Sequence, residues 1–158
     1  MNTEDKKMLK VVYTFFLGLL LAIFVGVGTN TFYGGPKPPE YSAALETYGK
    51  DPTPEQIKLQ KDYSARMDEY NRKMKPYNRN VSAVTLSAAV ILLTVSLAFE
   101  KKIKIIADGI MLGGVFTLLY SLGRSFASED TKYTFVVVSV GLIVAIYLGY
   151  HRFIKAQE

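Results

Sequence analysis

Charged residues are almost absent from four long stretches of this 158-residue chain. Of its 19 Lys and Arg and its 14 Asp and Glu residues, only Asp108 falls within residues 11–28, 81–99, 105–123 and 133–150. A helix of this length, 18 or 19 residues, extends about 27–28 Å, close to the roughly 30 Å hydrocarbon core of a bilayer. In a soluble domain, polar and apolar residues instead alternate with a period of about 3.6 residues in helices and 2 in strands. The segregation therefore excludes an ordinary soluble domain and predicts an integral membrane protein.

The apolar stretches are expected to be helices. Backbone amides in the hydrocarbon core must be satisfied internally, which leaves helices or a closed barrel, and barrel strands show an alternating polarity that these stretches lack. We therefore predict an all-α integral membrane protein, a four-transmembrane-helix bundle with a helical extramembrane hairpin between the first and second spans. The first stretch exceeds the usual length of a signal-peptide core and no A-x-A site follows it, so we expect an uncleaved helix.

Basic residues next to the spans predict the orientation. Lysines cluster before the first and third spans: Lys6, Lys7, Lys10, Lys101, Lys102 and Lys104. Two basic residues follow the fourth span, whereas the basic residues before the second span favour the opposite orientation. Three of the four spans therefore favour one orientation. It places residues 1–10, 100–104 and 151–158 in the cytoplasm and residues 29–80 and 124–132 outside it. From the small size and short tails we expect a bacterial plasma membrane.

The 29–80 loop contains a strong helix-start signal. Thr53 can cap a helix, Pro54 suits its first position, and Gln56 can close a capping box. From there apolar residues recur every three or four positions, which predicts one face of a helix over about 54–75. These residues are Leu59, Tyr63, Met67, Tyr70, Met74 and Tyr77, called here the Tyr/Met stripe. A shorter pattern predicts a helix at about 40–48, and Pro76 is expected to end or kink the longer one.

The Tyr/Met stripe has three possible roles. It can pack against the short helix of the same loop, against an identical helix in a homo-oligomer, or against a different membrane protein. Tyrosine and methionine are adaptable contact residues that are common at interfaces. The stripe residues are therefore candidates for contact with a partner.

Small residues recur at four-residue spacing in three of the spans. This spacing places them on one helix face, where backbones can approach closely. They are Gly18, Ala22 and Gly26 in the first span, Gly109, Gly113 and Thr117 in the third, and Gly141, Ala145 and Gly149 in the fourth. The pattern predicts tight helix packing, within one chain or between chains.

Two charged residues near the ends of the third span are candidates for a functional role. Asp108 is an ionisable group inside a span, which is a functional candidate by default, although Lys104 lies one turn earlier and can pair with it. Arg124 is expected to reach the membrane surface or to pair with Glu129 or Asp130. Asp108 and Arg124 lie about 24 Å apart along one helix and cannot pair with each other.

The residue types that support common enzyme chemistry are scarce. The chain has no cysteine, one histidine and no phosphate-binding glycine loop, so we expect no enzyme activity, no cofactor and no metal site. Its net charge of +5 is dispersed, which argues against nucleic-acid binding. We expect a structural, scaffold or accessory subunit that contacts the lipid bilayer and other membrane subunits, or a second copy of itself, through the extracytoplasmic amphipathic helix. The alternative is a subunit of an oligomeric channel or small-solute transporter with Asp108 at the pore mouth.

Overall fold

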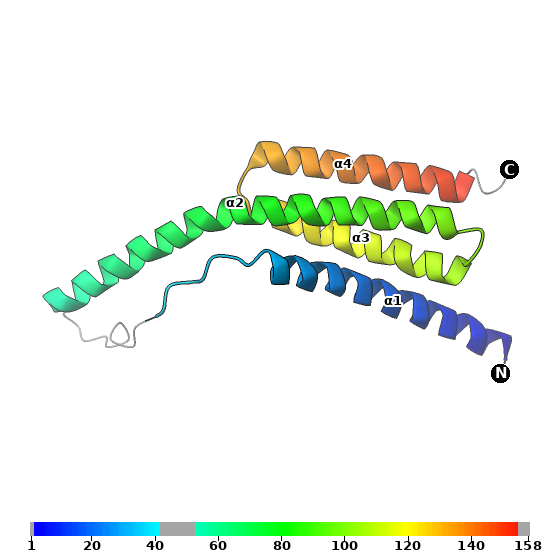
Figure 1. Cartoon of the computed structure of the whole chain (residues 1–158), viewed down its shortest axis with the longest axis horizontal. Helices are drawn as coiled ribbons and strands as arrows, with labels where there is room; N and C mark the ends of the chain where they lie inside the picture. Colours follow the sequence, from blue (N-terminus) through cyan, green and yellow to red (C-terminus); the bar gives the residue numbers. More distant parts are fainter. Residues whose placement is uncertain (1, 42–52, 155–158) are drawn as a thin grey trace.

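The described part of the chain is built from four long helices. The computed structural model describes residues 2–41 and 53–154, and within them it contains no strand (Figure 1). The helices are α1 (Thr3–Phe32), α2 (Pro54–Phe99), α3 (Lys104–Phe126) and α4 (Thr131–Gly149), followed by the π-helical turn η2 (Tyr150–Ile154). All four helices are long and apolar enough to span a membrane. The prediction of an all-helical chain with four such segments is therefore confirmed.

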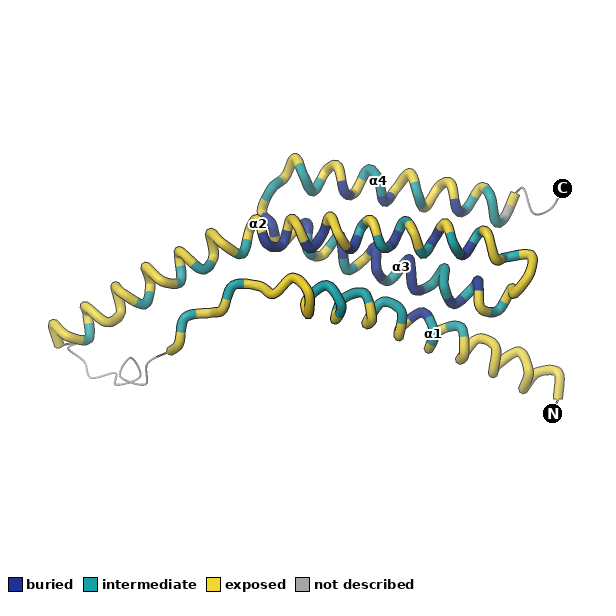
Figure 2. The backbone as a smooth tube through the Cα atoms, in the orientation of Figure 1, coloured by how far each residue is buried: buried dark blue, intermediate teal, exposed yellow. Residues whose placement is uncertain are grey.

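Helix α3 is at the centre of the packing. It lies along α2, and α1 and α4 flank this pair on opposite sides (Figure 1). Most buried residues belong to α2 and α3, whereas α1 buries only Gly18 and α4 buries three residues (Figure 2). Large apolar side chains such as Phe24 and Phe135 remain mostly exposed on α1 and α4. Such wide apolar faces are typical of helices that contact lipid or another protein.

Helix α2 is one continuous element of 46 residues. It begins with the expected capping box, in which Gln56 N donates to Thr53 Oγ1 (3.3 Å) and Thr53 N donates to Gln56 Oε1 (2.9 Å). Pro76 lies inside the helix and does not end it. The amphipathic helix and the second apolar stretch are therefore joined, and α2 changes direction between its free-standing half and its packed half (Figure 1). A bend of this kind is the usual consequence of a proline within a helix.

The segment before α2 is irregular where the structure describes it. Residues 34–41 are not helical and run beside the free-standing half of α2 (Figure 1). Most of the short helix predicted at 40–48 lies outside the described residues.

Small polar residues allow α2 and α3 to pack closely. Ser82 Oγ donates to the Ser121 carbonyl (2.9 Å), and Ser121 Oγ donates to the Ser82 carbonyl (2.8 Å). Farther along the same contact, Ser96 Oγ donates to the Ala107 carbonyl (2.9 Å). These hydroxyls are buried and satisfied, as polar groups within an apolar interface must be.

Candidate functional site

The Tyr/Met stripe becomes progressively more buried from the tip of α2 toward the packed helices. Leu59 near the tip is 42% exposed, the four residues from Tyr63 to Met74 are half-buried, and Tyr77 is 7% exposed. The stripe therefore consists of an accessible tip and a covered base.

Residues 33–41 of the same chain cover part of the stripe, mainly at its base. Tyr33 stacks on Tyr77 with ring centroids 5.3 Å apart, and Tyr41 meets Tyr63 edge-on at 5.6 Å. A Cβ at Gly35 would lie 3.0 Å from the Tyr77 ring, so only glycine fits there without displacement. Part of the stripe is thus used within the chain, by an extended segment in the described region.

Arg124 joins α3 to the base of the free-standing half of α2. Its Nη1 donates to Asn78 Oδ1 (2.8 Å), its Nε donates to the Tyr120 hydroxyl (3.0 Å), and its guanidinium lies over the rings of Tyr77 and Tyr120. The expected surface pair of Arg124 with an acidic residue is not formed. Glu129 instead pairs with Lys75 (2.6 Å) and Asp130 with Arg79 (3.8 Å).

Further hydrogen bonds connect all four helices at this base. The Tyr77 hydroxyl lies within hydrogen-bond distance of Asn30 Oδ1 (3.3 Å) and the Tyr33 carbonyl (3.2 Å), which ties α2 to the end of α1. Asn78 Nδ2 donates to the Ala127 carbonyl (3.1 Å), and the Tyr133 hydroxyl of α4 donates to the Arg79 carbonyl (3.0 Å). We call this set of contacts around Arg124 and Tyr77 the base network.

Asp108 lies at the opposite end of the helices and is paired with Arg152, not with Lys104. The π-helical turn η2 directs Arg152 toward α3, where its side chain is only 11% exposed. Arg152 Nε also lies 3.8 Å from Glu100 Oε1, and its Nη1 lies 2.9 Å from Met111 Sδ. The prediction of a Lys104 pair is wrong, because the return of the chain along α4 brings Arg152 of η2 beside Asp108.

The small residues of α1 and α3 lie where these helices cross. A Cβ would lie 2.6 Å from the Leu17 side chain at Gly109, 2.8 Å from Leu21 at Gly113 and 2.9 Å from Leu112 at Gly18. Ala22 is half-buried on α1, and Thr117 is buried on α3 with its hydroxyl bonded to the Gly113 carbonyl (2.7 Å). These positions allow α1 and α3 to approach closely.

The remaining small residues make looser contacts. A Cβ at Gly141 would meet Leu118 at an ordinary 3.6 Å, and one at Gly26 or Gly149 would meet nothing within 4 Å. Ala145 is exposed. Four-residue spacing does not identify Gly114, where a Cβ would lie 2.7 Å from Leu93 of α2. Gly114 falls outside the four-residue spacing because it faces α2 and not α1.

The buried polar side chains of α3 considered as candidates have partners within the protein. The hydroxyls of Ser121 and Ser125 bond to backbone carbonyls, as that of Thr117 does, and Asp108 is ion-paired. No group of three or more His, Asp and Glu residues that could hold a metal ion occurs in residues 2–41 and 53–154. Comparison with models of protein families, with curated proteins and with solved structures finds no match to this chain.

Proposed function

We propose that this protein is a membrane-embedded scaffold or accessory subunit that holds the free-standing half of α2 outside the membrane for contact with another membrane subunit. The observation that carries the proposal is the continuity of α2. One helix runs from a packed apolar half into a charged, free-standing half of about 25 residues, or roughly 37 Å.

The free-standing half has the supports expected of a rigid projection. At its start the capping box satisfies backbone groups that would otherwise lack partners. Along its surface Glu69 and Lys73 form a pair at 2.6 Å, and the hydrogen bond from Lys73 holds the pKa of the Glu69 carboxyl below its usual value. At its other end the base network fixes it to the neighbouring helices.

The tip offers the better surface for a partner. Leu59 is about two-fifths exposed, and the Tyr41 and Tyr63 rings meet close by. Charged residues such as Lys58 and Asp62 flank them in the sequence. Exposed aliphatic and aromatic groups with a polar surround are typical of the centre and rim of a protein interface.

The test compares two faces of the same helix. The double variant Leu59→Ala/Tyr63→Ala changes the stripe, and Lys61→Ala/Asp68→Ala changes the opposite face. After gentle detergent extraction from native membranes, we expect the wild type and the control to retain a stoichiometric membrane subunit. The stripe variant should bind it about tenfold or more weakly, the expected loss for truncated contact residues at an interface centre.

Two results would overturn the proposal. One is a wild-type protein that is purified without any second subunit or second copy. The other is an equal loss of the partner from both variants at unchanged helix content. A channel or transporter is the weaker candidate. The charge of Asp108, at the expected pore mouth, is already neutralised by its pair with Arg152.

A further inference from the structure

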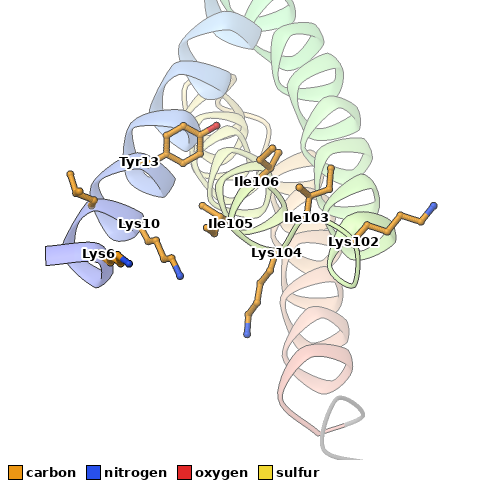
Figure 3. Close-up of a pocket in the computed structure, with 9 residues that line it drawn as sticks. Lys6, Lys10, Tyr13, Lys102, Ile103, Lys104, Ile105 and Ile106 are labelled. Atoms are coloured by element: carbon orange, nitrogen blue, oxygen red, sulfur yellow. The ribbon is translucent and has the colours of Figure 1, made fainter. Parts of the chain in front are cut away.

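Four lysines line a groove between the N-terminal half of α1 and the start of α3. Lys6 and Lys10 come from α1, and Lys102 and Lys104 come from the α2–α3 connection and the first turn of α3. The groove has a volume of about 770 Å³, and its other walls are apolar: Leu9, Tyr13, Ile103, Ile105 and Ile106. Figure 3 shows Lys10 and Lys104 extending in the same direction from neighbouring helices, whereas Lys102 points away.

The positive charge of this groove is not neutralised by ion pairs within it. None of the lining residues is acidic, and in the described ranges none of the four lysines forms an ion pair. The nearest acidic residue along α1, Asp5, accepts a hydrogen bond from the Asn2 backbone in the N-terminal cap. Like charges gathered beside apolar surface repel one another, so an anion placed between them is stabilised.

A second groove shares two of these lysines, Lys10 and Lys104. It has a volume of about 460 Å³, shares Lys10, Lys104 and Ile105 with the first groove, and continues along Phe15 and Leu112. Asp108 also lines it, with its charge held by Arg152. Two apolar grooves therefore extend from one pair of cations, which suits a ligand with one anionic head and two hydrocarbon chains.

We infer that this double groove binds an anionic phospholipid, with the headgroup phosphate between Lys10 and Lys104 and the acyl chains in the two apolar grooves. Lys6 adds charge at the edge of the first groove. Basic pockets between membrane helices are recognised sites for anionic headgroups. The inference rests on the proposed placement in a membrane and goes beyond the proposed contact with a protein partner.

The test uses the full chain in nanodiscs of phosphatidylcholine mixed with phosphatidylglycerol, followed by native mass spectrometry of the retained lipids. Lys10→Gln/Lys104→Gln removes the shared cations. Lys7→Gln/Lys101→Gln removes the same charge from the same two regions, at positions that line neither groove. We expect the wild type and the control to retain phosphatidylglycerol over phosphatidylcholine, and the groove variant to lose this preference by about 25-fold, since each of the two lysines strengthens attraction to anionic lipid about fivefold. Lys10→Arg/Lys104→Arg, which keeps the charge, should retain it.

Several outcomes would overturn the inference. Equal retention of both lipids by the wild type, or an equal loss in the control, would show that no specific site exists. Displacement of phosphatidylglycerol by inorganic phosphate would identify a site for the free anion. A wild-type protein that does not enter nanodiscs at all would instead overturn the membrane placement of the proposed function.

Discussion

At the scale of single residues, α3 carries a charged group near each end, and each group is bonded to a different helical element. Asp108 is paired with Arg152 of η2, and Arg124 is bonded to Asn78 of α2. A charge in an apolar environment is costly unless it is paired or hydrogen-bonded. Both groups therefore primarily stabilise contacts between helical elements.

The Asp108–Arg152 pair should be more important for stability than the nearby lysine. We expect Asp108→Asn to lower the free energy of unfolding by about 3 kcal/mol, because it leaves the largely buried Arg152 with only its longer pair to Glu100 (3.8 Å). Lys104→Gln should have little effect, because Lys104 is exposed. Unfolding in mixed micelles measures both, and equal losses from the two variants would contradict the observed pairing.

Arg124 should control the order of the α2 base. Arg124→Leu removes hydrogen bonds to Asn78 and Tyr120, each worth about 1.5–3 kcal/mol when one group is charged. We expect faster amide hydrogen exchange around Tyr77, measured by mass spectrometry. Arg79→Gln is the matched control, since the exposed Arg79–Asp130 pair should contribute about 1 kcal/mol or less. Unchanged exchange in Arg124→Leu would show that the base is held by other contacts.

At the scale of elements, the sequence predicts where helices exist better than where they end. The start of α2 was predictable because Thr53, Pro54 and Gln56 form a recognisable cap. Helix α1 extends beyond its apolar stretch to Thr3, and the Asn2–Asp5 capping box that starts it was present in the sequence but overlooked. Hydropathy marks only the apolar part of a helix, whereas its backbone hydrogen bonds continue into charged residues.

The face that each helix turns toward each neighbouring helix is harder to predict. Four-residue spacing identified Gly109 and Gly113, which meet α1, but not Gly114, which meets α2. The pairing of Asp108 with Arg152 likewise depends on how α3 and α4 are rotated about their axes. Such information is distributed over all the contacts of a helix, so no short motif reveals it.

Gly114 should be sensitive to any added side chain. In Gly114→Ala the new Cβ would lie 2.7 Å from the buried Leu93, so we expect a loss of about 1–3 kcal/mol from overpacking between α2 and α3. Gly123→Ala is the control on the same helix, because a Cβ there meets nothing within 4 Å and alanine favours the helix. Detergent unfolding measures both variants, and a loss in Gly123→Ala as large as that in Gly114→Ala would refute the overpacking explanation.

Gly35 should determine how residues 33–41 lie on α2. Gly35→Val should separate this segment from the Tyr77 ring and raise the protease sensitivity of the segment severalfold, since local opening then requires fewer contacts to break. Gly34→Val is the adjacent control, because a Cβ there meets nothing within 4 Å. Equal sensitivity of the two variants would mean that the contact with Tyr77 does not hold the segment.

At the scale of the whole molecule, the two polar clusters lie at opposite ends of the packed helices. The start of α1, the turn η2 and the α2–α3 connection lie at the end that contains Asp108, and the base network lies at the other (Figure 1). The proposed four membrane-spanning helices would require this arrangement, and the side of the membrane on which each end would lie is a prediction from the lysines.

Single cysteines can test that prediction, because the chain has none of its own. We expect Lys61→Cys and Lys132→Cys to react with a membrane-impermeant maleimide in intact cells. Lys102→Cys should react only after permeabilisation. All three positions are exposed in the structure. Labelling of Lys102→Cys from outside would reverse the predicted orientation and leave the fold unchanged.

The continuity of α2 also has a mechanical consequence. Because both halves belong to one helix, a tilt of the packed half would move the tip, with the base network as the pivot. A change of about 10° in the tilt of the packed half would move the tip by roughly 6 Å over an arm of about 37 Å. Helix tilt responds to bilayer thickness. The position of the tip would then report the thickness of the membrane in which the protein sits.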